Sequence, residues 1–448
     1  MTTALLEHHG SASGTLFRLA TAGSVDDGKS TLVGRLLHDS KAILADQLEA
    51  VARTSAERGF GGDDGGLDLA LLTDGLRAER EQGITIDVAY RYFATDRRTF
   101  VLADCPGHVQ YTRNTVTGAS TADAVVVLVD ARHGVLEQTR RHLSVVHLLR
   151  VPHVIVAVNK IDLVDYSEQV FDEIAAAVRR VAEDLGLADA VSVPVSALRG
   201  DNVVERSGHT PWYAGPTLME LLESLPSADD QDDAGASFRF PVQLVVRPQG
   251  AFAPGVDAGS FRDYRAYAGQ IAAGTVRRGD TVALLTPGQP ARTTTVVGID
   301  AAGRDLEEAT APQSVSLRLA GEFDVARGDL IAAAATAPAP SAHVTAEVCW
   351  LAQRPLRAGA AVLVKHGTAT VRALVQDVDG RLDLESLESE PAQALELNDI
   401  GRVRLRLAAP LPVEPYARHR RTGAFLVIDP QDGTTLAAGM VLDEGTDG

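Results

Sequence analysis

The chain has 448 residues, 45% of them hydrophobic, which is enough to bury two or three separate cores. No run approaches the roughly 18 to 20 apolar residues of a membrane-spanning helix, and residues 1–14 lack the basic and apolar regions of a signal peptide. The net charge of −18 argues against nonspecific binding to nucleic acid or to a membrane, and two cysteines are too few for a disulfide framework or a zinc site, so we expect a cytoplasmic protein.

A phosphate-binding loop is the first motif along the chain. Residues 23–30 read Gly-Ser-Val-Asp-Asp-Gly-Lys-Ser, which is two glycines with four residues between them, followed by lysine and a hydroxyl residue. The apolar run 17–22 predicts a strand before the loop, and the spacing of residues 31–37 predicts a helix after it. We expect a nucleoside triphosphate to be bound by Gly23, Ser24, Val25, Asp26, Asp27, Gly28, Lys29 and Ser30. Lys29 can reach the β- and γ-phosphates as a catalytic group, and the Ser30 hydroxyl can bind Mg²⁺.

Strand-like and helix-like segments alternate through the first half of the chain. Apolar runs predict strands at residues 17–22, 101–103, 124–129, 154–158 and 191–195, and helical spacing occurs at residues 139–149 and 167–185. This alternation predicts an α/β domain with a parallel sheet and helices on both faces. We assign residues 15–226 to this α/β domain with the phosphate loop (P-loop) and residues 1–14 to a flexible N-terminal tail.

The second half of the chain has a different pattern. Residues 227–236 are small and acidic and predict a linker. Helical spacing then disappears, and strands separated by Gly or Asp turns predict two β-barrel domains, at 237–333 and 342–448. An Ala- and Pro-rich break at residues 332–342 separates them. As an example, residues 274–277 and 281–285 are expected to form a strand pair around the turn Arg278-Gly279-Asp280.

Two groups of arginines lie in the last of these domains. Arg402, Arg404 and Arg406 alternate along one segment, and Arg418 to Arg421 form a basic turn around His419. A nucleic-acid contact and a solvated strand face both explain this pattern. We favour the solvated face and expect no nucleic-acid partner.

A second nucleotide motif, Asp104-Cys105-Pro106-Gly107-His108, follows the predicted strand at 101–103. The Asp104 carboxylate is expected to hold Mg²⁺ through a bound water. Gly107 has no side chain, so its N–H can approach the γ-phosphate. His108 is expected to orient the water that attacks this phosphate, which makes it the main catalytic candidate.

The base is expected to be recognised by two further segments that follow strands. Asp162, in Asn159-Lys160-Ile161-Asp162, can accept hydrogen bonds from the N1–H and 2-amino groups of guanine, which adenine does not offer. The aliphatic stem of Lys160 can cover the base. In the next segment, Ser196-Ala197-Leu198, the Ala197 N–H is expected to donate to guanine O6. These residues select GTP as the nucleotide.

Residues 83–86, Gly-Ile-Thr-Ile, lie between the phosphate loop and Asp104. Thr85 is the candidate for a second hydroxyl on Mg²⁺ and for a catalytic backbone contact to the γ-phosphate, in a segment that becomes ordered with GTP. A simple β-turn entering a strand at 86–92 would explain the same residues. The order of the motifs favours the switch segment.

Taken together, these motifs resemble the translation-factor class of GTPases, in which two β-domains also follow the GTPase domain. Within this class, the details are similar to the family of large, GTP-binding subunits (subunit 1) of bacterial sulfate adenylyltransferase. The likeness covers nearly the whole chain and is densest in residues 68–93, 110–114, 212–218 and 238–243. The Asp26-Asp27 pair in the phosphate loop also distinguishes the chain from elongation factors, which usually have His at the second position.

The resemblance implies a heterodimer with a small catalytic subunit of the ATP-pyrophosphatase type. That subunit transfers an adenylyl group from ATP to sulfate, and the large subunit hydrolyses GTP to drive this step. It also implies an apolar gate of Val25 and Ile84 around His108. A fused adenylylsulfate kinase, present in some relatives, is not expected because no second phosphate loop occurs in the sequence.

Two departures from the family pattern are Cys105, where Thr is usual, and the length of the segment 257–263. A second hypothesis is an elongation-factor-like GTPase that delivers an aminoacyl-tRNA with the same GTP switch. The acidic composition, Asp27 and residues 110–114 favour sulfate activation.

Overall fold

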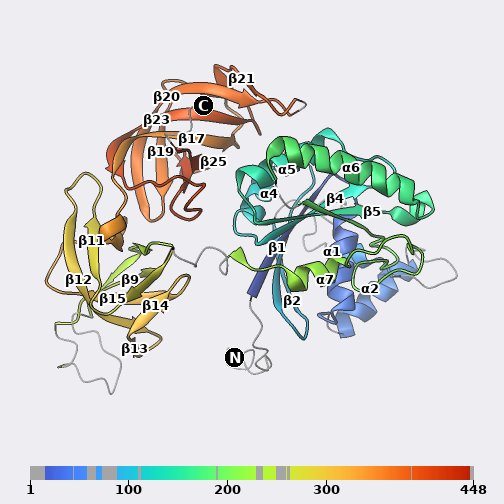
Figure 1. Cartoon of the computed structure of the whole chain (residues 1–448), viewed down its shortest axis with the longest axis horizontal. Coiled ribbons are helices and arrows are strands. Elements are labelled where there is room, and N and C mark those ends of the chain that lie inside the picture. The colour runs from blue at the N-terminus through green and yellow to red at the C-terminus, as the bar shows by residue number, and fades with distance from the viewer. Residues whose placement is uncertain are drawn as a thin grey trace. The chain divides into compact units, whose positions relative to one another are not determined.

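The computed structural model describes residues 16–43, 45–57, 67–72, 88–108, 112–187, 190–228, 236–248, 259, 263–384 and 386–443. The chain divides into two compact units, Met1–Ala228 with Asp383–Glu388, and Asp229–Leu382 with Ser389–Gly448. The first unit contains the predicted α/β domain, and the second contains antiparallel β-sheets (Figure 1).

A six-stranded sheet in the order β2-β3-β1-β4-β5-β6 forms the centre of the first unit. Its strands are β1 Leu16–Gly23, β2 Ala89–Ala94, β3 Thr99–Asp104, β4 Ala124–Asp130, β5 His153–Asn159 and β6 Ala190–Pro194. All neighbours are parallel except β2, which runs antiparallel to β3 at the sheet edge. The parallel sheet is therefore confirmed for five strands. The exception is β2, because the short turn 95–98 that joins it to β3 allows only an antiparallel pair.

Helices cover both faces of this sheet (Figure 1). They are α1 Lys29–Asp39, α2 Ala45–Glu57, α4 Thr112–Ala119, α5 Glu137–Leu148, α6 Glu168–Leu185 and α7 Leu218–Ser224, with 3₁₀ turns η2 Leu69–Leu72 and η4 Ile161–Val164. One core joins α1 and α7 to the sheet through Leu32, Leu36, Leu218 and Phe100. Helices α4, α5 and α6 contact the strands as a second layer. The helix α6 begins as expected after Ser167, whose hydroxyl accepts from the Val170 N–H.

The second unit begins with an eight-stranded antiparallel sheet in the order β7-β16-β11-β12-β15-β9-β8, with β13 paired to β12. Its strands are β7 Arg239–Pro241, β8 Leu244–Val246, β9 Ala266–Gln270, β11 Thr281–Leu285, β12 Arg292–Ala301, β13 Arg304–Leu306, β15 Ser314–Leu319 and β16 Leu330–Ala333. A separate pair joins β10 Thr275–Arg277 to β14 Glu308–Thr310. The Gln243 N–H, directly before β8, donates to the Ala268 carbonyl of β9 at 2.9 Å and extends the pairing of these two strands.

Six strands form a closed ring in the last part of the chain, because β19 pairs with both β20 and β24. The strands of this barrel are β17 Ser341–Trp350, β19 Ala361–His366, β20 Ala369–Leu382, β23 Ile400–Leu411, β24 Ala424–Ile428 and β25 Thr435–Val441, with the short strands β18 Leu356–Arg357, β21 Ser389–Glu390 and β22 Ala394–Leu395 beside them. Closure leaves no free strand edge in the ring. The side chain of Trp350 is buried in its core.

Of three predictions for the second unit, one is wrong, one is partly wrong and one is confirmed. The strand pair predicted around residues 278–280 is wrong, because β10 pairs with β14, and β11 pairs with β12 and β16. The predicted break beginning at Ala332 is partly strand, since β16 continues to Ala333. The alternation of Arg402, Arg404 and Arg406 is confirmed as an exposed face of β23. Arg404 pairs there with Asp377 and Asp379.

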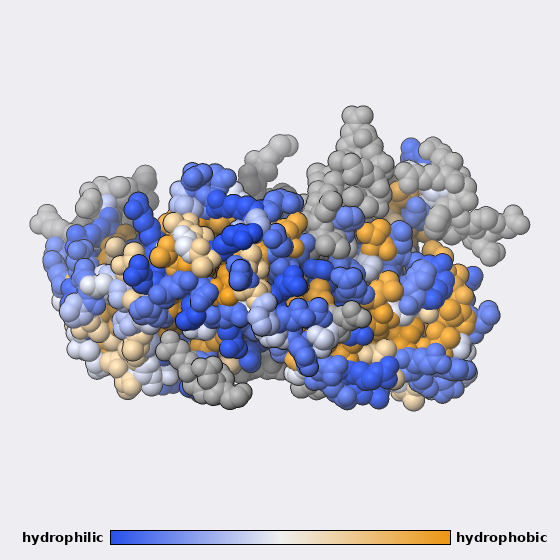
Figure 2. All heavy atoms as spheres, turned by 90° about the horizontal axis from the view of Figure 1, so that it is seen from above, coloured by the Kyte–Doolittle hydropathy of each residue, from blue (hydrophilic) through white to orange (hydrophobic). Residues whose placement is uncertain are grey.

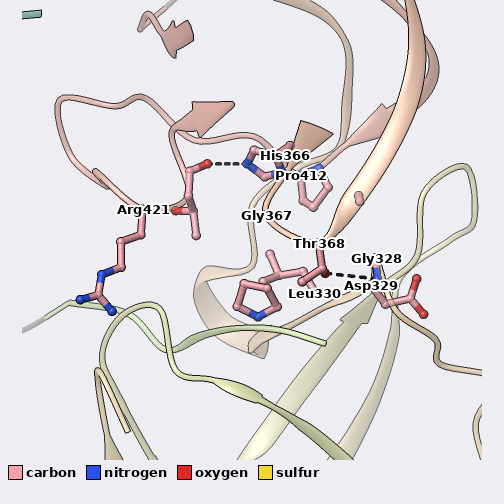
Figure 3. A pocket seen from close by; sticks show the side chains of 11 residues that line it. Gly328, Asp329, Leu330, His366, Gly367, Thr368, Pro412 and Arg421 are labelled. Carbon is pink, nitrogen blue, oxygen red and sulfur yellow. Dashed lines mark hydrogen bonds between the residues drawn. The ribbon is translucent and has the colours of Figure 1, made fainter. Parts of the chain in front are cut away.

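A buried ion pair and a small pocket lie where the two sheets of the second unit contact each other. The Arg239 guanidinium donates to both carboxylate oxygens of Glu414, at 3.0 and 2.8 Å. Figure 3 shows the neighbouring pocket, where His366 Nε2 donates to the Thr422 carbonyl at 2.6 Å and the Gly328 N–H donates to Thr368 Oγ1 at 3.2 Å. These contacts hold β7, β19 and the segment after β23 together.

Hydrophilic side chains surround smaller apolar patches on the face drawn in Figure 2. Within the described parts of the chain, no helix has the length and apolar character needed to cross a membrane.

Candidate nucleotide-binding site

The phosphate loop connects the end of β1 at Gly23 with the start of α1 at Lys29. Gly28 precedes the helix with a φ of 91°, in the left-handed region that glycine adopts without strain. A Cβ at this position would overlap the Asn159 amide nitrogen. The strand, turn and helix predicted around residues 23–30 are therefore present, with the N-terminus of α1 at the loop, where backbone N–H groups favour an anion.

Lys29 folds back over its own loop. Its Nζ donates to the carbonyls of Gly23 and Ser24, at 2.9 and 2.7 Å. The side chain is buried, and this burial lowers the pKa of the ammonium group. Because an ammonium has three donors, these two contacts leave one for an anion at the loop.

Asp27 uses one of the loop's own donors. Its Oδ2 accepts from the Ser24 N–H at 2.6 Å, so this N–H does not point freely toward a ligand. Burial raises the pKa of the Asp27 carboxyl. The Ser24 hydroxyl, in contrast, is buried and has no hydrogen-bond partner within the described structure. A buried polar atom without a partner is unusual and is consistent with a polar ligand at this position.

Asp104 is held at the end of β3, directly beside β1. The two strands pair Thr21 with Asp104, and the Thr21 hydroxyl donates to Asp104 Oδ1 at 3.0 Å. Nearby, a Cβ on Gly107 would overlap Lys29 Nζ and lie 2.6 Å from the Gly23 carbonyl oxygen. The glycine is thus required for the Asp104 motif to approach the phosphate loop.

The structure describes only some of the remaining candidate residues around the γ-phosphate. His108 is exposed to solvent at the end of the Asp104 segment. Val25 is also exposed, at 40%. Thr85 and Ile84 lie outside the described residues, so the switch segment, its β-turn alternative and the proposed gate remain predictions. Cys105 is buried, and burial raises the pKa of its thiol, which fits an inert packing role.

Asn159 connects three segments of the site. Its Nδ2 donates to the Asp27 carbonyl of the phosphate loop at 2.7 Å, and its Oδ1 accepts from the Ala197 N–H at 3.0 Å. The Ala197 N–H is therefore occupied by Asn159, although the sequence assigned it to guanine O6. This arrangement makes Asn159 a bridge between the phosphate loop and the predicted base-recognition turn.

The Lys160 ammonium group lies between a backbone carbonyl of the phosphate loop and a carboxylate at the end of β4. Its Nζ donates to the Asp26 carbonyl and lies 2.9 Å from the carboxylate of Asp130 at the end of β4. Burial alone would raise the pKa of Asp130, but hydrogen bonds from Arg132 and Lys160 hold it well below the usual range. Asp130 thereby fixes the Lys160 head group and leaves its aliphatic stem along the site.

Asp162 and the turn 196–200 complete the site. Arg199 Nε lies 3.6 Å from Asp162 Oδ2, and the Arg199 side chain is 65% exposed. The Asp162 side chain is 8% exposed, but the contact is long and its arginine is solvated, so the ion pair is weak and a guanine edge can replace Arg199. Ser196 is buried, and its hydroxyl accepts from the Arg199 N–H at 3.2 Å, which closes the turn.

Comparisons with known proteins agree with this geometry. Residues 15–227 match the Elongation factor Tu GTP binding domain, and residues 343–442 match the GTP-eEF1A C-terminal domain-like family. A sulfate adenylyltransferase subunit 1 from Cellvibrio japonicus is 46% identical, over 96% of this chain and 87% of its own length. The chain belongs to the sulfate adenylyltransferase subunit 1 family. Its fold class and GTP-binding domain, and the family resemblance seen in the sequence, are thereby confirmed.

Two further relatives are bifunctional enzymes that are longer than this chain. A bifunctional enzyme CysN/CysC from Mycobacterium tuberculosis is 50% identical over 96% of this chain and 67% of its own length. The corresponding enzyme from Rhodopirellula baltica is 47% identical over 97% of this chain and 64% of its own length. The chain thus spans about two thirds of these bifunctional relatives. The elongation-factor alternative is not favoured, since these relatives carry the subunit 1 and CysN names over nearly the whole chain.

Three residues of the candidate nucleotide-binding site were not predicted from the sequence. Thr21 is a hydroxyl residue within an apolar strand run, and this interruption was a usable signal. Asp130 ends the apolar run of β4, in the position after a strand where the other motif residues lie. Arg35, on α1, donates to the carbonyls of the turn 196–200 and has no such signal in the sequence.

Proposed function

We propose that this chain binds and hydrolyses GTP as the large subunit of a sulfate adenylyltransferase, and that hydrolysis drives adenylyl transfer from ATP to sulfate on a small partner subunit. The observation that carries the nucleotide assignment is the 2.7 Å hydrogen bond from Asn159 to the Asp27 carbonyl. It brings a guanine motif and a phosphate loop into one site, as GTP recognition requires.

The nucleotide contacts follow from the placement of these segments. The loop from Gly23 to Ser30 would surround the phosphates, with the third Lys29 donor directed to the β- and γ-phosphates. Asp162 would accept from guanine N1–H and the 2-amino group, and the Lys160 stem would cover the base. The turn from Ser196 to Ala197 would border the O6 side. Asp104 and Gly107 would lie at the γ-phosphate end.

The residues present fit Mg²⁺ beside the phosphates. A hydroxyl at Ser30, a carboxylate at Asp104 and a hydroxyl at Thr85 are the oxygen ligands that this ion prefers, with Asp104 acting through water. When bound, Mg²⁺ would neutralise phosphate charge. Thr21 supports the proposal, because its hydrogen bond keeps the Asp104 carboxylate oriented before any ligand arrives.

Hydrolysis would require a positioned water and a stabilised leaving group. His108 would orient the water for attack on the γ-phosphorus, the bond from this phosphorus to the β–γ bridging oxygen would break, and GDP and inorganic phosphate would leave. Lys29 would compensate the charge that develops on the bridging oxygen. Thr85 would hold the γ-phosphate through its N–H, in a segment that loosens after phosphate release.

The partner would be a small catalytic subunit of the ATP-pyrophosphatase type. It would bind ATP and sulfate and release pyrophosphate and adenosine 5'-phosphosulfate. The subunit 1 name of the relatives supports a multi-subunit assembly. The heterodimer and the cytoplasmic location predicted from the sequence remain parts of this proposal.

Reconstitution with the small subunit tests this function. We expect adenylyl transfer from ATP to sulfate to accumulate more product when GTP is present, with GDP formed in parallel. Lys29→Ala should abolish the GTP effect while leaving the slower transfer without GTP unchanged. The proposal would be contradicted if the amount of product were the same with and without GTP. It would also be contradicted if the chain retained aminoacyl-tRNA on a filter in the presence of a nonhydrolysable GTP analogue.

A further inference from the structure

Arg35 connects the phosphate-binding helix to the base-recognition turn. It lies on α1, six residues after Lys29, and its guanidinium donates through Nε to the Ala197 carbonyl at 3.1 Å and through a terminal nitrogen to the Leu198 carbonyl at 2.5 Å. These two carbonyls are consecutive in the chain. One planar group therefore holds two successive peptide units of the turn.

The position of this guanidinium is itself restrained. Its other terminal nitrogen lies 3.4 Å from the Asp39 carboxylate, one helical turn further along α1, and Asp39 also contacts His38 Nδ1 at 2.7 Å. The Arg35 side chain is only 17% exposed. Such a restrained fork presents its donors at fixed angles, which a flexible ammonium group does not.

The hydrogen bonds of the turn leave one donor available. Four of its N–H groups are engaged within the turn or by its neighbours: Ser196 with the Asp201 carbonyl, Ala197 with Asn159, Arg199 with Ser196 Oγ, and Gly200 with the Ser196 carbonyl. Among the described residues, no partner occurs for the Leu198 N–H. The Leu198 side chain is 48% exposed, so this peptide borders solvent or a ligand.

Geometry couples this free donor to Arg35. The Ala197–Leu198 peptide is trans, so its carbonyl and its N–H point in opposite directions. Because Arg35 holds the carbonyl on one side, the Leu198 N–H is directed away from the guanidinium. We propose that Arg35 is a positioning residue for guanine specificity, which fixes this peptide so that the Leu198 N–H donates to O6.

This inference rests on the proposed GTP function and refines it, because the Ala197 N–H is held by Asn159. It also links the two ends of the nucleotide. Six residues of α-helix separate Lys29 from Arg35 by about 9 Å along the axis, so one rigid helix sets both the phosphate and the base contacts.

Three nucleotides separate O6 recognition from the other contacts. GTP and ITP both carry O6 and N1–H, and ITP lacks only the 2-amino group. The triphosphate of 2-aminopurine riboside keeps the 2-amino group but lacks both O6 and N1–H, so for each nucleotide the variant is compared with the wild type. For the full-length chain with Arg35→Lys, we expect GTP and ITP to bind about 3- to 10-fold more weakly than to the wild type, as the loss of one neutral hydrogen bond implies. The affinity for 2-aminopurine riboside triphosphate should stay unchanged.

Arg98→Lys is the matched control. Arg98 is a buried arginine of the same unit that also donates to two carbonyls, those of Leu222 and Leu225 at 3.0 and 2.6 Å, away from the turn. It should lower the melting temperature without changing any of the three affinities.

The outcomes separate the two proposals. Equal losses for all three nucleotides, or wild-type affinities for all three, would overturn the positioning role of Arg35. If the wild-type chain binds ATP as tightly as GTP, the proposed GTP function itself fails. A wild type that prefers GTP, together with an Arg35→Lys loss confined to nucleotides with O6, supports both.

Discussion

The Nδ2 of Asn159 donates to the main-chain oxygen of Asp27 at 2.7 Å, and both residues are buried. The motif that is expected to read the base therefore also holds the loop that is expected to bind the phosphates. Oδ1 of the same side chain accepts from the Ala197 N–H. One amide thus satisfies two backbone groups from segments that are far apart in the chain.

Replacing this amide should disturb both ends of the nucleotide. Asn159→Ala leaves the Asp27 carbonyl and the Ala197 N–H without their partner, at about 1–3 kcal/mol for each buried group. We expect GTP and GDP affinities to fall together by at least roughly tenfold, measured by titration calorimetry.

Asn202→Ala provides the comparison, since Asn202 is a buried asparagine that holds the Pro194 carbonyl and Thr210 at 2.9 Å. It should lower stability without a similar loss of affinity. Equal effects of both variants on affinity would contradict the bridging role of Asn159.

Asp162→Asn should change base preference. An amide can donate to the 2-oxo group of xanthine, whereas it cannot accept from both N1–H and the 2-amino group of guanine as the carboxylate does. We expect the preference to shift from GTP toward xanthosine triphosphate by roughly 10- to 100-fold, as for hydrogen bonds to a charged group. Competition binding measures the ratio, and an unchanged ratio would remove Asp162 from base recognition.

His108→Ala should separate binding from hydrolysis. The side chain is exposed beside the Asp104 motif and is expected to orient water, so its loss should leave GTP affinity intact. Single-turnover phosphate release should slow by roughly 10² to 10⁴, the range for a positioned acid–base group. Normal turnover would place this role on another residue.

His142 should make the stability of the first unit depend on pH. It is buried on α5, contacts Gln138 at 3.2 Å, and burial lowers the pKa of its imidazole to about 3. Below about pH 6.5 the unfolded chain binds a proton that folded His142 does not, so stability should fall by up to about 1.4 kcal/mol per pH unit toward pH 3.

His142→Gln removes this proton linkage. Urea unfolding between about pH 6.5 and 4.5 should therefore show a shallower pH dependence for His142→Gln than for the wild type. Parallel slopes for His142→Gln and wild type would show that His142 does not carry the effect.

The buried pair of Arg239 and Glu414 should stabilise the second unit. Burial alone would raise the pKa of Glu414, but hydrogen bonds from Arg239 and Thr422 lower it. Its contribution is therefore present above the ordinary glutamate pKa and is lost as the pH falls through the lowered value. Glu414→Gln leaves the Arg239 charge uncompensated and should cost about 3–5 kcal/mol.

A double variant distinguishes charge from packing at this position. Arg239→Met with Glu414→Leu removes both charges and should recover most of the stability that Glu414→Gln loses. Urea unfolding measures each free energy. A Glu414→Gln variant as stable as the wild type would mean that the ion pair contributes no net stability.

Much of the first unit could be predicted from the sequence because its signals are local. A phosphate loop needs two glycines, a lysine and a hydroxyl within eight residues, and strands and helices show their own periods over short windows. The loop at Gly23, the helix after Lys29 and the strands before Asp104 and Asn159 are all found where these patterns placed them. The sequence alone therefore determined the fold class and the family.

Tertiary structure alone decided which groups meet across the chain. The hydrogen bonds from Thr21 to Asp104, from Arg35 to Ala197 and from Lys160 toward Asp130 join residues on different elements. The partner of β10 is likewise β14 rather than its neighbour β11. Such pairings depend on how elements pack and on which buried polar groups need partners, and no short window of sequence records that choice.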